Sequence, residues 1–564
     1  MKAADMEVEK MQTKLARWSQ DQSFEFDDKF NVVYDGAFLF EAWLSVEANL
    51  GSETAGVDGL TAEDYRKQGL KENLFSLSDR LKSGAYEPDP VRRVYIPKGP
   101  DEVRPLGIPT IEDRIVQESL RMVLEPIYET DFSDDSFGFR PNRSCHDAIK
   151  LAYMELSPGS GRYNRWILDL DIKGFFDNVD HTELMWILQD RITDSEVLDL
   201  IYDTLKAGVK ENGQVQVTGK GTPQGGIVSP LLANVYLNEL DWWIKGWTEG
   251  QKGGPESWTY VRYADDFMIL TSGDKEDAEA MKGRVEEFLD EELNLRLSQE
   301  KSSIRHAQDG LSFLGYDMVA DSTSGACKMF VPQEAKDYIR GRIRKATNGD
   351  TDVSVRRKVR SLNSVVRGWA NYYKYCIDAA KVFHDVRHLL WHRMTHWLAE
   401  KHKCSRKQLI QRKLDSKNPI RINKITLFDP DGMSTTRTES PRRHGHPYLC
   451  EDGDGKPEPQ WKKRYREGHP GPDPYLAGEE ERSGSEDQSQ WARVRDENTC
   501  QSTGCEASGR KSTVVHHIRH RRSADDDRID NLVVLCHRCH RKVHHTDQVV
   551  TVQHEGMDEP KELT

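Results

Sequence analysis

The tetrapeptide Tyr263-Ala264-Asp265-Asp266, set between two apolar runs, constrains the fold of this chain more than any other feature. The runs are Trp258–Arg262 and Phe267–Thr271. Both suit β-strands, so we expect an antiparallel hairpin with the acidic pair at its tip. Adjacent carboxylates that are partly desolvated are costly unless a cation neutralises them, and hard divalent cations prefer carboxylate oxygens. The tip therefore predicts a metal site; a solvated turn is the alternative, because Asp is common in turns.

A second acidic segment lies at Trp166–Asp177. Leu168 and Leu170 alternate with Asp169 and Asp171, so a strand here would place its carboxylates on one face. We expect the strand to end beside the hairpin tip and to gather Asp171, Asp265 and Asp266. Such a set can hold two Mg²⁺ roughly 4 Å apart and support in-line displacement at a phosphate. For Asp169, Asp177 and Asp180 we favour a solvated or structural role.

Composition limits the classes of protein that this chain can be. Its 564 residues predict several domains, and a hydrophobic content of 36% is sufficient for folded cores. No apolar run approaches the roughly 18 residues of a membrane span, and the charged segment Met1–Gln22 has no signal-peptide pattern. We therefore expect a cytoplasmic protein, in a prokaryotic cytosol or nucleoid, with no membrane partner.

The charge of the chain is unevenly distributed. The net charge of −14 argues against a polyanionic partner, but Arg340–Leu414 holds 19 Lys/Arg against 5 Asp/Glu. This is a basic segment of about domain size, as nucleic-acid-binding domains have.

Short blocks rich in Pro, Gly and charged residues follow one another between about residues 50 and 400. They are Tyr95-Ile96-Pro97-Lys98, Arg104–Pro109, Phe139–Ser144, Asp171–Lys173, Gly221–Leu231, the Tyr263–Asp266 box and Phe313–Tyr316. The series resembles reverse transcriptases, and among them the group II intron-encoded proteins. The resemblance implies an RNA-directed DNA polymerase in which Asp171, Asp265 and Asp266 bind two catalytic Mg²⁺, with the Ile172 carbonyl as a further ligand.

The same resemblance implies a set of nucleotide contacts. Lys98 and Arg104 would hold the triphosphate of an incoming dNTP, and Lys301 would border the primer or triphosphate. Phe176 would wall the sugar pocket and exclude a ribose 2′-hydroxyl; the alternative, a core Phe, fits Phe175 better. The Gly221–Gly226 loop would lie close to a nucleotide with Gln224 near the template or substrate. Ser229 is predicted to N-cap a helix that has Pro230 at its first position.

The segment Leu362–Tyr373 resembles the thumb or maturase domain that follows the palm in group II intron proteins. Cations interleaved with aromatic residues suit a folded RNA, because charge holds phosphates while rings pack or stack. The predicted RNA contacts are Arg356, Arg357, Lys358, Arg360, Arg367 and Lys374. The alternative is a solvated face over an aromatic core, which suits Trp369, Trp391 and Trp397.

Two cysteine pairs near the C-terminus, Cys500-x4-Cys505 and Cys536-x2-Cys539, have the spacing of a tetrahedral Zn²⁺ site. Disulfides are disfavoured in a reducing compartment. His540 and His544, four residues apart, would share a helix face and could chelate a second metal.

Together with His516-His517 and Asn531, this pattern resembles the His-Asn-His (HNH, ββα-metal) endonucleases. The resemblance implies that His517 is the general base and that Asn531 fixes its loop. His516, His540 and His544 would hold one divalent cation, Mg²⁺ or similar.

The predicted fold class is an α+β multidomain chain: a right-hand fingers/palm polymerase, an α-helical thumb/maturase domain and a small zinc-bound ββα-metal (HNH) domain. The predicted segments are an N-terminal extension with the start of the fingers (1–100), fingers and palm (101–335), the basic helical domain (336–414), a linker with a DNA-binding region (415–490), the endonuclease (491–546) and a polar tail (547–564).

The expected function is that of a multifunctional mobile-intron protein that binds intron RNA as a ribonucleoprotein. It would assist splicing, nick target DNA and copy the RNA into DNA from dNTPs. The alternatives are a reverse transcriptase of another class, such as a retron or defence-associated enzyme, and an RNA-binding splicing factor with relic sites. The sequence leaves open whether the chain forms a homodimer, which intron it serves and which site it targets.

Overall fold

The computed structural model forms two compact units, Met1–Asp473 and Pro474–Thr564. The described residues are 8–97, 103–157, 165–211, 213–216, 219–222, 225–250, 258–321, 326–349, 351–412, 414, 416–417, 420–422, 425–435 and 446–449, and the strands at 513–517, 532–536, 550–552 and 561–563. None of the helices in this part of the chain is long and apolar enough to cross a membrane.

The N-terminal region is mostly helical. Its helices are α1 (Val8–Ser19), α2 (Phe30–Val33), α3 (Gly36–Ala48), α4 (Ala62–Lys67), α5 (Leu70–Lys82) and α6 (Ile111–Tyr128), with a short 3-10 turn η1 (Leu50–Glu53). Thr61 and Asp64 form a capping box on α4, and Thr110 caps α6, so local side chains start both helices. Helices α1 and α3 both pack on α6, which is buried along nearly its whole length.

A small sheet follows, in the order β2-β1-β4-β5. It contains β1 (Val91–Pro97), β2 (Val103–Ile108), β4 (Val209–Glu211) and β5 (Gln214–Gln216). Strands β1 and β2 pair antiparallel, and Ile96 is the partner of Arg104. The predicted β segment around Arg104 is confirmed; Lys98 lies outside the described residues.

The central sheet has the order β6-β7-β3-β8 and is antiparallel throughout. Its strands are β3 (Trp166–Asp171), β6 (Trp258–Tyr263), β7 (Asp266–Thr271) and β8 (Ser303–His306). The predicted hairpin and the strand ending at Asp171 are both confirmed. Helices α8 (Phe175–Asn178), α9 (His181–Gln189) and α10 (Ser195–Lys206) lie between β3 and β4 in the sequence.

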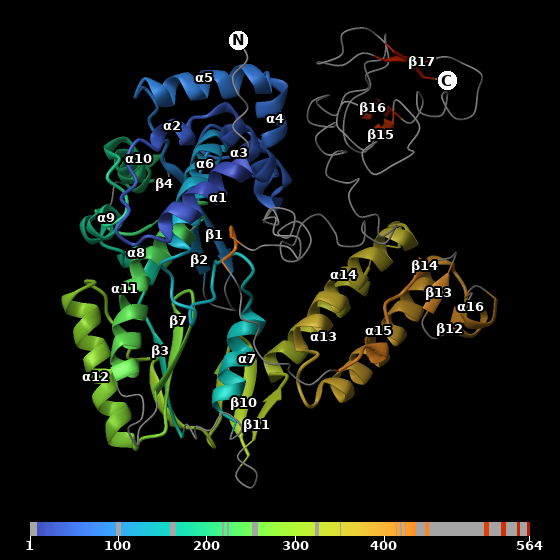
Figure 1. Ribbon diagram of the computed structural model, residues 1–564. Helices are drawn as coiled ribbons and strands as arrows, with labels where there is room; N and C mark the ends of the chain where they lie inside the picture. The colour runs from blue at the N-terminus through green and yellow to red at the C-terminus, as the bar shows by residue number, and fades with distance from the viewer. Residues whose placement is uncertain are drawn as a thin grey trace. The chain divides into compact units, whose positions relative to one another are not determined.

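Helices cover both faces of this central sheet (Figure 1). One face, with Leu168, Leu170 and Phe267, shares a core with α11 (Ser229–Gly250) and α12 (Lys275–Glu291). The other face, with Ile167 and Met268, shares a core with α7 (Cys145–Glu155). Asp169 and Asp171 alternate with the buried leucines along β3, as predicted.

The basic segment is helical, as predicted: α13 (Gln333–Thr347), α14 (Val355–Tyr373), α15 (Ala379–Lys401) and α16 (Arg406–Arg412). It follows a three-stranded sheet of β9 (Leu311–Phe313), β10 (Tyr316–Ala320) and β11 (Cys327–Phe330). Trp397 is fully buried, Trp369 is buried and Trp391 is half-buried, in keeping with the aromatic core expected for these three.

The helical domain extends further than predicted. Strands β12 (Ser416–Lys417), β13 (Ile420–Ile422) and β14 (Ile425–Thr426) form a small antiparallel sheet, followed by the 3-10 turn η3 (Pro430–Gly432). Ile420, Ile422 and Leu427 are buried in the same core as α14 and α15. The start of the predicted linker at 415–490 therefore belongs to this domain; apolar residues in such short strands give too little periodicity to be recognised.

In the second unit, β15 (Thr513–His517) pairs antiparallel with β16 (Leu532–Cys536). This agrees with the two strands of a ββα-metal domain. The segment predicted as a polar tail contains β17 (Val550–Val552) and β18 (Lys561–Leu563), which also pair antiparallel. The sequence pattern did not indicate these two short strands, because strand pairing needs backbone groups and not an apolar pattern.

Candidate metal centre

The acidic residues of three chain segments meet at one end of the central sheet. Asp171, the last residue of β3, is the direct register partner of Asp266, the first residue of β7. Tyr263 pairs with Asp266 across the hairpin, which leaves Ala264 and Asp265 as a two-residue tip. Paired residues of antiparallel strands project from the same face, so Asp171 and Asp266 are neighbours. The structure therefore places the three predicted ligands at the same end of the sheet.

These carboxylates share a partly desolvated environment. Burial, reinforced by Asp265, Asp171 and Asp169, raises the pKa of Asp266 to about 6. Burial also raises the pKa of Asp265, and Asp171 adds to this while Arg104 and Lys301 oppose it. The pKa of Asp169 is raised by burial as well, which favours the structural over the solvated one of the two roles expected for it. Crowded, buried carboxylates favour a cation or a proton.

No preformed ligand cage exists within the described part of the chain: nowhere do three His, Cys, Asp or Glu side chains converge closely enough to hold a metal ion. Two observations support a divalent metal at this site: the register that pairs Asp171 with Asp266, and the burial and mutual repulsion of the carboxylates, which raise the pKa of Asp266. Oxygen donors of this kind suit Mg²⁺. Ile172, whose carbonyl was predicted as a further ligand, is buried. Its backbone forms an isolated antiparallel β-bridge with Leu297.

Lys301 lies beside the carboxylates. Its Nζ is 3.4 Å from Oδ2 of Asp171, although the lysine side chain is 59% exposed. The backbone of Asp171 is held on both sides: Ser302 Oγ accepts from its N–H at 3.1 Å, and Ser298 N–H donates to its carbonyl at 2.7 Å. The predicted place of Lys301 at this centre is in agreement with this contact. Arg104 is exposed on β2 and acts electrostatically on Asp265.

Phe176 and Phe175 occupy different environments, as predicted. Phe175 is buried in the core, whereas Phe176 is half-buried and its ring centroid lies 6.3 Å from that of Phe139. Phe139 is 50% exposed and has a left-handed backbone (φ +58°). Two aromatic rings thus stand together on the surface, next to β3.

The Gly221–Gly226 loop makes close backbone contacts. Gly221 (φ +93°) would bring a Cβ to 3.0 Å from the carbonyl oxygen of Asp177, and a Cβ at Gly225 would overlap the carbonyl of Gly107. The loop was expected to lie close to a nucleotide, and the close contacts that the structure shows are with the protein backbone. Gln224 lies outside the described residues. Helix α11 begins at Ser229, whereas the sequence predicted Ser229 as the N-cap and Pro230 as the first helical residue. The predicted start of the helix was therefore one residue late.

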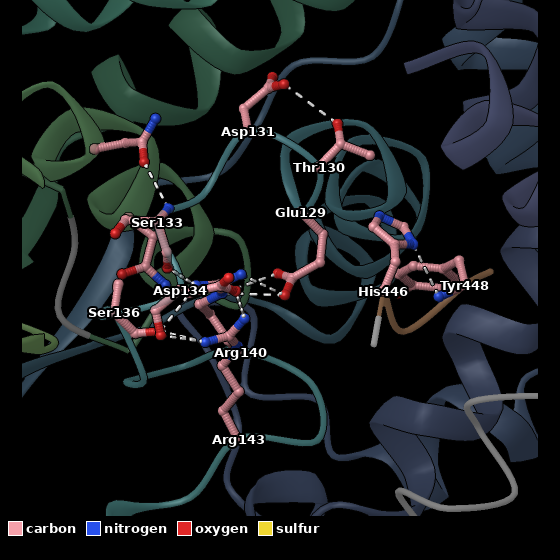
Figure 2. A network of polar contacts seen from close by, with 12 residues as sticks. Glu129, Thr130, Asp131, Ser133, Asp134, Ser136, Arg140, Arg143, His446 and Tyr448 are labelled. Carbon is pink, nitrogen blue, oxygen red and sulfur yellow. Dashed lines mark hydrogen bonds and ion pairs between the residues drawn. The ribbon is translucent and has the colours of Figure 1, made fainter. Parts of the chain in front are cut away.

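A buried ion pair organises the Phe139–Ser144 block (Figure 2). Arg140 donates hydrogen bonds to both carboxylate oxygens of Glu129. Its guanidinium also donates to the carbonyls of Ser133 and Ser136. Burial raises the pKa of Glu129, an effect that Arg140 opposes. The pair holds the loop that carries Phe139.

A second buried ion pair supports the hairpin tip, and sequence reasoning missed it. Arg262 and Asp241 are both fully buried, with Nη2 of Arg262 2.5 Å from Oδ2 of Asp241. Arg262 Nη1 also donates to the carbonyl of Ala264 at 3.0 Å and to Asn234 at 2.9 Å. Ala264 has a left-handed backbone (φ +59°), which costs an L-residue roughly 1–2 kcal/mol. The only sequence signal was a charged residue inside an apolar strand, which must be paired when it is buried.

Gly138 completes this support. A Cβ at Gly138 would overlap the backbone nitrogen of Ala264, so only glycine allows the two segments to approach so closely. Asn234 donates to the Gly138 carbonyl at 2.9 Å, and Phe137 N–H donates to the Arg262 carbonyl at 2.9 Å. The loop after α6 and the acidic tip therefore form one hydrogen-bonded unit.

The six cations predicted to bind RNA fall into two groups. Arg356, Arg357 and Arg360 are exposed on α14. The other three contact the protein itself: Lys358 donates to the Ala346 carbonyl at 2.9 Å and lies over Trp397, Arg367 lies over Phe428, and Lys374 lies over Tyr375. For Lys358, which is half-buried, the predicted RNA contact is not supported, because its ammonium is used inside the domain.

The C-terminal site is described only through its strands. His516 and His517 end β15, His517 is the register partner of Leu532, and Cys536 is the last residue of β16. The side chains of these residues lie outside the description, as do the predicted site residues Cys500, Cys505, Cys539, Asn531, His540 and His544. The strand pair brings Cys536 and the two histidines onto one small sheet.

Three known families match separate segments of the chain. The family described as reverse transcriptase (RNA-dependent DNA polymerase) matches residues 96–318. The group II intron maturase-specific domain matches residues 337–414, and the HNH endonuclease family matches residues 500–546.

Whole-protein relatives agree with these matches. Protein YkfC of Escherichia coli (strain K12) is 37% identical over 56% of this chain and 89% of its own length. The group II intron-encoded protein LtrA of Lactococcus lactis subsp. cremoris is 36% identical over 54% of this chain, and the match spans 59% of LtrA. A putative COX1/OXI3 intron 2 protein of Saccharomyces cerevisiae is 31% identical, with 38% of its length matched.

The chain belongs to the group II intron-encoded proteins, a multifunctional class in which reverse transcriptase, maturase and, here, HNH endonuclease domains share one polypeptide. The domains support RNA-directed DNA polymerase and DNA endonuclease activities. A reverse transcriptase of another class and a relic splicing factor are not favoured by these matches.

Proposed function

We propose that DNA synthesis takes place where Asp171, Asp265 and Asp266 meet. The observation that carries the proposal is the β3–β7 register, which makes Asp171 and Asp266 direct partners. Two Mg²⁺ ions at this centre would orient a primer 3′-hydroxyl and neutralise charge that develops on the phosphates. The protein contributes the carboxylates and, through Arg262 and Gly138, a tip that keeps its position.

The surrounding residues suit a deoxynucleoside triphosphate. Arg104 and Lys301, with Lys98, would contact the phosphates. Phe176, braced by Phe139, would wall the sugar pocket and disfavour a 2′-hydroxyl. Gln224 would lie near the template or substrate. The hydrogen-bonded backbone of Asp171 would hold its carboxylate in place beside Lys301.

The helical domain is proposed to bind the intron RNA and to stabilise its splicing-active fold. Arg356, Arg357 and Arg360 project from one exposed helix, where they can contact phosphates. Adding the full chain to precursor RNA at low Mg²⁺ tests this role: splicing should increase even when Asp265 and Asp266 are replaced by Ala. The mass of the complex would also measure whether one or two copies of the chain are bound.

The C-terminal unit is proposed to nick target DNA and so leave a 3′-hydroxyl for the polymerase. Cys500, Cys505, Cys536 and Cys539 would hold a structural Zn²⁺. His517 would activate water, Asn531 would fix its loop, and His516, His540 and His544 would bind one divalent cation. His517→Ala should abolish nicking and leave cDNA synthesis on a pre-nicked template intact. The whole particle is expected in the cytosol or nucleoid.

Poly(rA)/oligo(dT) extension with Mg²⁺ tests the polymerase assignment. The double replacement Asp265→Ala, Asp266→Ala should remove incorporation, because it deletes the proposed ligands. Asp177→Ala is the matched control, since Asp177 is exposed on α8 close to the same motif and is assigned no ligand role. Equal incorporation by the wild type and the double variant would refute the assignment.

A further inference from the structure

The C-terminal end of α14 is capped by side chains of α7 and β10. Carbonyls in the last turn of a helix have no partner within it. The carbonyl of Tyr372 accepts a hydrogen bond from His146 Nε2 at 2.9 Å and another from the Tyr316 hydroxyl. His146 lies in the first turn of α7, and Tyr316 is the first residue of β10. Two elements outside the helix thus hold one of its terminal carbonyls.

The side chain of Tyr372 contacts the turn between β9 and β10. The Tyr372 hydroxyl donates to the Leu314 carbonyl at 2.6 Å. Leu314 and Gly315 are the two turn residues between β9 and β10, and both have left-handed backbones (φ +46° and +73°). This conformation is unfavourable for a leucine, so the contacts around the turn must maintain it. Tyr372 therefore links α14 to a strained hairpin turn.

The contact region is tightly packed. The His146 ring lies 4.9 Å from the Tyr372 ring, and the fully buried Tyr316 lies 5.4 Å from both Tyr372 and Tyr373. Burial lowers the pKa of His146, and Lys150 and Lys374 lower it further. The neutral imidazole must carry its proton on Nε2, because a carbonyl can only accept.

The start of α7 also reaches the catalytic hairpin. Helix α7 packs against β6, the hairpin strand that ends at Tyr263, just before the acidic tip. Beside the turn is a groove of about 600 Å³, whose lining includes Gly315, Tyr338, Arg342, Gly368 and Tyr373. One wall of this groove is thus set by the contact between α14 and the turn.

We infer that His146 is a positioning residue that acts through Tyr372 to hold the end of α14 against the Leu314–Gly315 turn. It touches neither nucleotide nor metal. Its effect is on how tightly a primer–template duplex, lying against the turn and the groove, is held. This inference rests on the polymerase function proposed above.

Steady-state extension of poly(rA)/oligo(dT) by the full chain tests the inference. His146→Ala should raise KM for primer–template about tenfold, the effect of removing one effective hydrogen bond, and leave kcat within about twofold. His146→Gln should restore most of the affinity, because its amide N–H can donate from a similar position. Tyr372→Phe, which keeps the ring and removes the bond to Leu314, should change KM in the same direction.

His306→Ala is the matched control: His306 is half-buried in the central sheet against Trp166 and has no described contact with α14. It should leave KM unchanged. The inference is overturned if His146→Ala and Tyr372→Phe only lower the melting temperature, or if the Gln variant resembles the Ala variant. Absence of incorporation by the wild type would instead refute the proposed function, and the inference with it.

Discussion

Asp171 and Asp266 are direct partners across the β3–β7 ladder, although they belong to segments far apart in the sequence. Because paired side chains in an antiparallel sheet share a face, this one register relation determines that the carboxylates repel each other unless a cation or a proton is present. The behaviour of the site with pH follows from it.

Asp266 should make the stability of the metal-free protein depend on pH. Its pKa is about 6 in the fold against an ordinary value of 3.8, so the folded state holds an extra proton between these values. Its contribution to stability is present below about pH 4 and is lost as pH rises through 6. Mg²⁺ should therefore raise the melting temperature at pH 7.5 and have little effect at pH 5. Asp113 and Asp135 also have a pKa of about 6 but lie outside the site. Asp266→Asn should therefore abolish the effect of Mg²⁺ on the melting temperature and leave the pH dependence that Asp113 and Asp135 cause.

The Arg262–Asp241 pair should be needed for folding and, separately, for catalysis. Asp241→Ala leaves a fully buried guanidinium unpaired and should cost about 3–5 kcal/mol in the free energy of unfolding. Replacing both residues by Leu should recover most of that stability in denaturant titrations. DNA synthesis should remain absent in the double variant, since nothing then donates to the Ala264 carbonyl. Full activity in the double variant would contradict this role.

Gly138→Ala should disable the acidic tip at a cost of about 1–3 kcal/mol in the free energy of unfolding, which leaves the domain folded. The added Cβ overlaps the Ala264 backbone, which has to move together with Asp265. We expect kcat to fall about 100-fold, in line with the effect of small displacements at catalytic centres. Gly36→Ala, where no atom lies within 4 Å of the new Cβ, is the control and should retain wild-type rates.

RNA affinity should depend on the exposed arginines of α14 and not on Lys358. Replacing Arg356, Arg357 and Arg360 by Ala should reduce the slope of log affinity against log salt by about three, because each arginine is expected to neutralise one phosphate. Filter-binding titrations with intron RNA at several salt concentrations measure this slope. Lys358→Ala should leave the slope unchanged and lower the melting temperature, because Lys358 bonds to Ala346 and covers Trp397.

Local patterns in the sequence determined the elements that carry the chemistry. Alternation of Leu and Asp defined β3 and the face of Asp171, the apolar runs around Ala264-Asp265 defined the hairpin, and helical periodicity with clustered cations defined α13 to α16. Each of these signals is a property of neighbouring residues, so no knowledge of the rest of the chain was needed.

Only the tertiary structure decided which distant residues support those elements. Arg262 finds Asp241, Gly138 meets Ala264, and His146 caps Tyr372 because separate segments pack together, and no local period encodes such contacts. Packing likewise turned Lys358 inward and drew Ile420 and Ile422 into the helical core. Side-chain burial depends on what the whole fold places opposite each residue, which is why these roles appear only in three dimensions.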